Sequence, residues 1–190
     1  GPEEVEAAMN RQIREDAYSW AQKRLGVDVA RFGNDRSVIF PRQGLVAFRP
    51  VEMRQQDTCA IGARVAQAKV RWGSELEFID DTGHWGHGVY DNLRAAGYNP
   101  QAVIFSDPAL NPRYANRRAE MLFEAVEWIR RGGCLPNLPE LLQEICAPTY
   151  FFNQGKLQVE PKELVKKRLG RSPDLFDALA LTFALPDQPG

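Results

Sequence analysis

Acidic side chains occur at three separated points of the sequence where the surrounding residues are apolar. Asp28 lies within a β-branched run, Asp80 and Asp81 close a second apolar run, and Asp177 interrupts a third. An ionised carboxylate among apolar residues is costly unless a positive charge compensates it. Hard oxygen ligands without His or Cys favour Mg²⁺ or Mn²⁺ over zinc. A carboxylate cluster can hold two such ions about 3.5–4 Å apart, the arrangement for in-line attack on a phosphodiester.

Each acid also has an explanation that needs no metal ion. Asp28 could face solvent on an edge strand, or it could pair with Arg31 or Arg36. One acid of the pair at 80–81 could simply be solvated. Asp177 has the weakest such explanation, because a polar residue deep in an apolar helix requires a partner.

Two further groups stand close to these acids in the sequence. Asp174 lies one turn before Asp177 on the same helical face, where it could serve only as a first-turn acid that stabilises the helix dipole. The only histidines, His84 and His87, are three residues apart in a glycine-rich segment. That spacing is more typical of a loop pair than of a zinc site.

A basic segment precedes the last acids. The net charge of the chain is −1, but a nearly neutral protein can bind a polyanion when one face carries the positive charge. The alternative is a solvated helix surface. The candidate phosphate contacts are Lys162, Lys166, Lys167, Arg168 and Arg171.

The apolar patterns predict a mixed sheet with helices on both faces, because an antiparallel meander is followed by strands that alternate with helices. The predicted strands cover residues 27–30, 37–40, 45–48, 75–80 and 102–105, and a hairpin covers 150–159. The predicted helices cover residues 3–24, 57–72, 89–96, 115–131, 139–146 and 172–184. Asp57 and Ser172 are the predicted N-caps of two of them, with Pro173 at the first helical position.

Length and composition favour one globular unit. The 190 residues suffice for one well-buried core, and no apolar run is long enough to span a bilayer. Three scattered cysteines argue against a disulfide framework and for a reducing, intracellular setting. The opening Gly-Pro is typical of a protease-cleavage scar, so we expect residues 1–24 to be a linker helix with this remnant and residues 25–190 to form the domain.

The three acid-bearing segments also match a known family. The first, residues 26–39, combines Asp28 with a hairpin, and the second, residues 78–93, contains the run Asp-Asp-Thr-Gly. The third, residues 172–179, reads Ser-Pro-Asp-Leu-Phe-Asp-Ala-Leu and is the most specific. Together they resemble the C-terminal nuclease domain of the large terminase subunit of tailed bacteriophages, over most of the chain.

This resemblance implies an RNase H-like fold and a set of metal ligands. It implies Asp28, Asp81 and Asp177 as catalytic ligands, with Asp174 as a supporting ligand. Asp81 is preferred to Asp80 because its spacing from Asp28 fits the family better, and the choice fails if strand alternation turns Asp80 toward Asp28. One ion would then lie between Asp28 and Asp177, and the other between Asp28 and Asp81.

The resemblance also implies partners and a location. The substrate is double-stranded DNA, and the basic segment and the hairpin at 150–159 fall where family members flank the DNA. The family's large subunit carries an N-terminal ATPase motor, which this chain lacks, and works with a portal and a small terminase subunit. It acts in the cytoplasm of the infected bacterial host and is not part of the mature virion.

The resulting hypothesis is a nuclease that uses two Mg²⁺ or Mn²⁺ ions to cut viral double-stranded DNA with little sequence specificity during genome packaging. One alternative is another RNase H-like nuclease, of the junction-resolvase or integrase type. Another is a DNA-clamping module without catalysis, which would bind DNA with a steep salt dependence. An actin-like ATPase is disfavoured, because the sequence lacks a second phosphate loop.

Overall fold

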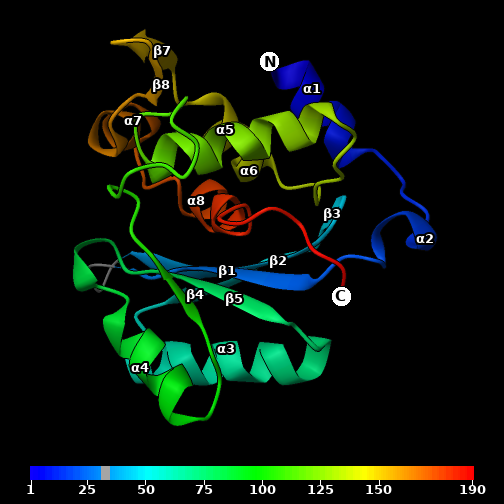
Figure 1. Cartoon of the computed structure of the whole chain (residues 1–190), viewed down its shortest axis with the longest axis vertical. Helices are drawn as coiled ribbons and strands as arrows, with labels where there is room; N and C mark the ends of the chain where they lie inside the picture. The colour runs from blue at the N-terminus through cyan, green and yellow to red at the C-terminus, as the bar shows by residue number, and fades with distance from the viewer. Residues whose placement is uncertain (31–34) are drawn as a thin grey trace.

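A mixed β-sheet lies between two layers of helices (Figure 1). The computed structural model of the chain describes residues 1–30 and 35–190, so the turn of the first predicted hairpin, at 31–34, lies outside the described residues. In the described part the sheet has the order β3-β2-β1-β5-β6, and β4 also pairs with β2. Its strands are β1 (Lys23–Asp28), β2 (Arg36–Gln43), β3 (Val46–Ala47), β4 (Val51–Arg54), β5 (Leu76–Asp80) and β6 (Gln101–Val103).

The direction of strand pairing changes at β1. This strand pairs antiparallel with β2 and parallel with β5, and β5 continues in parallel to β6. A parallel pair requires a crossover connection, and helices provide it here: α3 (Thr58–Trp72) precedes β5, and α4 (His87–Ala95) leads from β5 to β6. The mixed sheet with helices on both faces, as predicted from the sequence, is confirmed.

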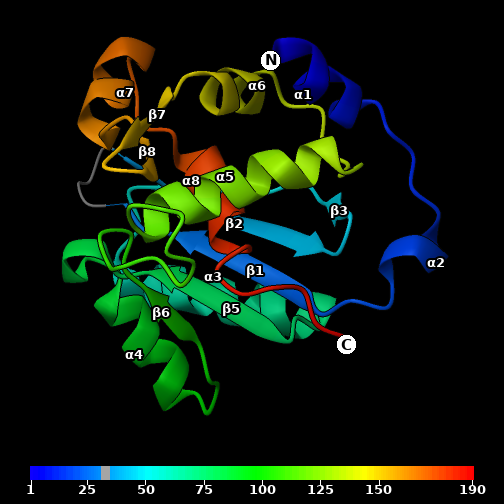
Figure 2. The ribbon, with the colours of Figure 1, turned by 45° about the horizontal axis from the view of Figure 1, so that its top comes forward.

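The second helical layer covers the opposite face of the sheet (Figure 2). Helix α8 (Asp174–Leu181) lies against β1 and β2, and α5 (Arg117–Arg130) packs on α8. The remaining elements of this layer are α6 (Pro139–Cys146), the hairpin of β7 (Tyr150–Asn153) and β8 (Lys156–Val159), and α7 (Lys162–Leu169). The two layers bury separate apolar cores, one between the sheet and α3 with α4, the other between the sheet and α5 with α8.

The N-terminal region differs from the single helix that we predicted over residues 3–24. It contains α1 (Pro2–Met9), then the short α2 (Glu15–Tyr18), and residues 23 and 24 already belong to β1. Helix α1 packs on α5 and α6 and buries Val5 and Ala8 in the main core. The apolar side of α1 therefore docks on the domain, although the division of the chain at residue 24 remains a prediction. No helix in the described ranges is both long and apolar enough to cross a membrane.

Candidate active site

The register of two parallel strands brings the first two acids together. Val27 of β1 pairs with Ile79 of β5, so the next residues along each strand, Asp28 and Asp80, are neighbours at the carboxyl ends of the strands. Side chains alternate between the two faces of a sheet. Val27 and Ile79 belong to the core under α3 and α4, whereas Phe78 belongs to the core under α8. Asp28 and Asp80 consequently point toward α8.

Close approach of α8 supplies the other two acids. A Cβ atom placed on Gly26 would lie only 2.0 Å from the carbonyl oxygen of Ala178, so glycine is required where β1 passes under the helix. The first turn of α8 carries Asp174 and Asp177, one helical turn apart on one face. Asp28, Asp174 and Asp177 are all buried, at 3%, 7% and 1% exposed.

The start of α8 is fixed by a buried glutamate that the sequence did not reveal. We predicted Ser172 as the N-cap, but Pro173 occupies that position and makes no side-chain cap hydrogen bond. Instead Oε1 of Glu144, on α6, accepts hydrogen bonds from the backbone N–H groups of Leu175 and Phe176. Its Oε2 accepts one from Arg36, at 2.8 Å. A partner 31 residues earlier in the chain therefore orients the helix that carries Asp174 and Asp177.

The four acids place several negative charges close together in a buried site. Burial raises the pKa of the Asp28 carboxyl well above its ordinary value, and the carboxylates of Asp174, Asp80 and Asp177 raise it further, against the opposing effect of Lys162. Burial likewise raises the pKa of Asp174, which hydrogen bonds with Asp28 and Ser172 offset only in part. The cluster therefore favours a bound cation, because a cation removes the repulsion that raises these pKa values.

Among the described residues, two cations reach the cluster: Arg36 lies 3.4 Å from Oδ2 of Asp174, and Lys162, at the start of α7, lies against Asp177. Nζ of Lys162 lies 2.7 Å from Oδ2 of Asp177, a close ion pair, although this oxygen accepts no well-directed hydrogen bond. Burial lowers the pKa of the Lys162 ammonium, but the Asp177 and Asp28 carboxylates outweigh that effect and the pKa is raised. Sequence reasoning placed Lys162 among the DNA contacts; the structure places it against the acids.

The acids surround a cavity of about 210 Å³. Asp28, Asp80 and Asp174 line it together with Lys162, and Asp35 and Lys166 also contribute to its wall. Liquid water occupies about 30 Å³ per molecule, so the cavity has room for one or two partly hydrated ions. In the described part of the chain, the potential ligand atoms at the cavity are carboxylate oxygens, without imidazole or thiolate, so the residues fit Mg²⁺ or Mn²⁺.

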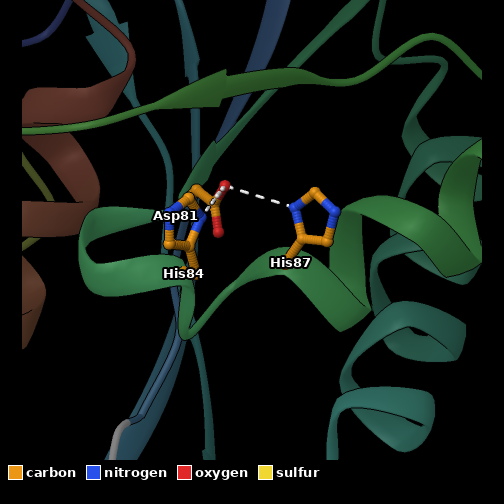
Figure 3. Close-up of side chains that lie close together, drawn as sticks. All are labelled: Asp81, His84 and His87. Carbon is orange, nitrogen blue, oxygen red and sulfur yellow. Dashed lines mark hydrogen bonds and ion pairs between the residues drawn. The ribbon is translucent and has the colours of Figure 1, made fainter.

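Asp81 directly follows β5, and its carboxylate lies with the imidazoles of His84 and His87 (Figure 3). Its backbone N–H bonds to Val103 of β6, and its carboxylate oxygen Oδ2 lies 3.4 Å from Nδ1 of His87 and 3.7 Å from Nδ1 of His84. Asp80, in contrast, lines the cavity with Asp28. The geometry therefore favours Asp80 over Asp81 as the neighbour of Asp28, against our preference from spacing. The alternation of Phe78 and Asp80 was the sequence signal that pointed to this.

Some side chains of the predicted basic segment form ion pairs with carboxylates of the protein, and others do not. Arg168 forms ion pairs with Glu160, and Arg171 lies 3.5 Å from Glu144. Lys166 is half-buried at the rim of the cavity, and Lys167 is exposed. Over residues 1–30 and 35–190, neither of these two lysines has an ion-pair partner, so both are available to an anionic ligand.

A larger cavity, of about 480 Å³, lies between α5 and the C-terminal segment. Its charged groups already neutralise one another: Arg42 binds Asp187 through two hydrogen bonds, and Arg117 binds Glu120 at 2.7 Å. The smaller acidic cavity is therefore the better candidate for chemistry.

Comparison with known structures identifies similar folds, whereas no family model matches the sequence. The nuclease domain of the large terminase subunit gp2 of bacterial virus Sf6 matches with a TM-score of 0.78 and 20% identity, over 98% of both chains. A mutant of that domain with manganese matches with a TM-score of 0.73 and 19% identity, over the same shares. The large terminase nuclease from thermophilic phage G20c with bound magnesium matches with a TM-score of 0.60 and 17% identity, over 86% of this chain and 81% of that one. The RNase H-like fold is confirmed, and with it, at the level of the fold, the resemblance to large terminase nuclease domains that the acid-bearing segments indicate.

Proposed function

We propose that this chain is a divalent-metal-dependent endonuclease that cuts double-stranded viral DNA, with little sequence specificity, during genome packaging. One observation carries the proposal: the buried carboxylates of Asp28, Asp80 and Asp174 line one cavity, and the buried Asp177 interacts with Asp28 beside it. Two lysines, Lys162 and Lys166, line the same cavity. The similar structures, which include phage terminase nuclease domains with manganese or magnesium, support the same activity.

In this proposal the acids divide the work of holding two Mg²⁺ or Mn²⁺ ions. Asp28 and Asp177 would hold one ion, Asp28 and Asp80 would hold the other, and Asp174 would support the set. Bound divalent ions supply Lewis acidity that activates water and stabilises charge on the phosphate. Oδ1 of Asp80 accepts a hydrogen bond from the backbone N–H of Thr82 at 3.0 Å, which orients this carboxylate before any ion binds.

Lys162 has a separate role beside the acids. Its ammonium neutralises part of the negative charge while the cavity holds no ion, through the contact with Asp177. The same ammonium can turn to a phosphate oxygen when DNA occupies the cavity, because lysine is a flexible point charge. Lys162 would thus contact DNA, as predicted from the sequence, and would pair with Asp177 when DNA is absent.

The DNA backbone is proposed to lie across the mouth of the cavity. Lys166, at the rim, and Lys167, beside it on α7, contact phosphates without sequence information. Arg168 and Arg171 are expected to contribute less to DNA binding, because each already lies close to a carboxylate of the protein, Glu160 and Glu144 respectively. The exposed rings of Phe151 and Phe152 on the adjacent hairpin add an apolar surface.

The wider setting is also a proposal. By analogy with the terminase large subunits, the chain would work with an ATPase domain, a portal and a small terminase subunit in the cytoplasm of the infected host, outside the mature virion. The fold alone does not require these partners.

The test is the nicking of supercoiled plasmid in Mn²⁺ by the wild type and by Asp→Asn variants. Asp28→Asn is expected to abolish nicking while the thermal unfolding transition remains cooperative. Asp80→Asn should lower the rate far more than Asp81→Asn does. Undiminished cutting by Asp28→Asn would overturn the proposal, and a dominant effect at Asp81 would restore the assignment from sequence spacing.

The choice of substrate separates the alternatives. Similar rates on linear duplexes of unrelated sequence support the packaging nuclease, whereas a strong preference for four-way junctions identifies a resolvase. Salt-sensitive DNA binding without cleavage in any divalent ion identifies a clamping module.

A further inference from the structure

We propose that Asp81, His84 and His87 form a second metal site, separate from the acid cavity and selective for a transition-metal ion of the Zn²⁺ class. The ligand atoms of these three side chains all lie within 4.8 Å of one another. Figure 3 shows both imidazole rings directed at the same carboxylate. This inference does not depend on the nuclease proposal, because none of the three residues lines the acid cavity.

The distances match metal ligands better than a hydrogen-bonded pair. Charge-assisted hydrogen bonds between nitrogen and carboxylate oxygen are about 2.7–2.9 Å long. Here Oδ2 of Asp81 lies 3.4 Å from Nδ1 of His87 and 3.7 Å from Nδ1 of His84. Ligands held about 2.1 Å from a tetrahedral zinc ion are separated by about 3.4 Å. The two distances from the carboxylate to the imidazoles therefore already suit ligands of one ion, and all three ligand atoms lie within 4.8 Å of one another.

Asp81 also carries unmet binding capacity. Its side chain is 6% exposed, and its buried Oδ1 has no hydrogen-bond partner. A buried unpaired carboxylate oxygen is costly, and a cation is the partner that removes this cost most directly. Two imidazoles with one carboxylate suit Zn²⁺, whereas the acid cavity offers oxygen alone and suits Mg²⁺ or Mn²⁺.

The surroundings of His87 orient it as a ligand. Its outer nitrogen, Nε2, faces Oδ2 of Asp91 at 3.6 Å, one turn further along α4, and its ring stacks on Tyr90. At 3.6 Å this contact is an electrostatic one and not a hydrogen bond, so it favours the ring orientation without fixing the tautomer. His84 is more exposed and completes the site from the turn Thr82–His84.

The place of the site in the fold suggests what it does. Asp81 directly follows Asp80 at the end of β5, and a Cβ on Gly86 would lie 2.0 Å from the carbonyl oxygen of Asp80. The loop 82–86 is thus packed against the strand end that presents Asp80 to the acid cavity. An ion held by Asp81, His84 and His87 would tie this loop to β5 and α4.

The test is a titration of the protein with Zn²⁺ alone. Calorimetry measures the binding, and the imidazole ¹⁵N resonances show whether the histidines are ligands. The chain has only two histidines, so these resonances report on His84 and His87 without assignment by mutation. We expect one Zn²⁺ to shift both rings. The double variant His84→Ala/His87→Ala should lose this binding event, and both side chains are sufficiently exposed for the fold to tolerate the change.

Asp80→Asn is the matched control, because it alters the neighbouring acid in the other cavity. Zn²⁺ should still shift both imidazoles in this variant. The proposal is overturned if Zn²⁺ leaves the imidazoles unmoved, or if the binding event survives the double histidine variant and disappears in Asp80→Asn. A shift of only one of the two imidazoles overturns the three-ligand assignment.

Discussion

The substitution Gly26→Ala tests whether the close approach of α8 to β1 assembles the acid cluster. The new Cβ atom would lie 2.0 Å from the carbonyl oxygen of Ala178, and also 3.2 Å from Cβ of Leu181. The obstacle is helix backbone, so no side-chain rotation can relieve it. Because Cβ atoms essentially never approach within 3.0 Å of another heavy atom, the helix must move away from the strand by about 1 Å.

That displacement acts on stability and on cleavage to different extents. Overpacking of a buried contact by one methyl group costs about 1–3 kcal/mol of unfolding free energy. A misplacement of about 1 Å in a catalytic set can lower the rate about 100-fold. We therefore expect a folded protein that unfolds at lower urea concentration and nicks plasmid in Mn²⁺ about 100-fold more slowly. Calorimetry with Mn²⁺ should show correspondingly weaker ion binding, because Asp28 and Asp177 move apart.

Gly62→Ala is the control for adding a methyl group to a buried glycine. Gly62 lies in α3 on the far side of the sheet, and its added Cβ would meet only the side chain of Asn92, at 3.0 Å. We expect little change in cleavage for this variant. Wild-type cleavage and stability in Gly26→Ala would refute the argument, since the helix could then not depend on glycine for its position.

Three further outcomes are expected. First, burial raises the pKa of Glu144 to about 7, against the opposing charge of Arg36. The folded state then binds this proton more tightly than the unfolded state does, so the unfolding free energy should fall by about 3 kcal/mol as the pH rises from about 4.5 to 7. Urea unfolding of Glu144→Gln should lack this decrease, and an identical pH profile would contradict it. Second, the double variant Lys166→Ala/Lys167→Ala should lower the slope of log K against log salt by about 2 in DNA-binding titrations, and an unchanged slope would exclude both phosphate contacts. Third, Phe152 is 73% exposed, so Phe152→Ala should leave the melting temperature unchanged but weaken DNA binding about five-fold, or 1 kcal/mol. Wild-type affinity would show that the hairpin does not touch DNA.

Local patterns in the sequence were sufficient for much of the fold. Asp57 caps α3 as predicted, by accepting a hydrogen bond from the backbone N–H of Ala60. Helix α6 has the predicted bounds, and the hairpin at 150–159 forms with its turn between Asn153 and Lys156. These features depend on residues a few positions apart, which is the range over which capping and turn chemistry act.

Features that depend on distant partners were not predictable in the same way. The start of α8 is capped by Glu144 from α6, so the local Ser-Pro-Asp pattern gave a cap that does not form. The residues of α1 that are buried could not be predicted locally, because they are covered by α5 and α6, which lie far away in the sequence. Lys162 in a run of basic residues looked like a phosphate contact, and only the tertiary structure shows its pairing with Asp177.

The end of β5 shows how one register choice distributes two adjacent acids between two sites. Phe78 and Asp80 face the layer of α8, and Ile79 belongs to the core under α3 and α4. The chain leaves the strand at Asp81, whose carboxylate lies with His87 of α4. A shift of β5 by one residue would exchange these faces and remove the second strand acid from the cavity at Asp28. The proposed chemistry therefore depends on the pairing of Val27 with Ile79, and the two neighbouring acids have distinct environments because the strand ends at Asp80 and the chain turns away at Asp81.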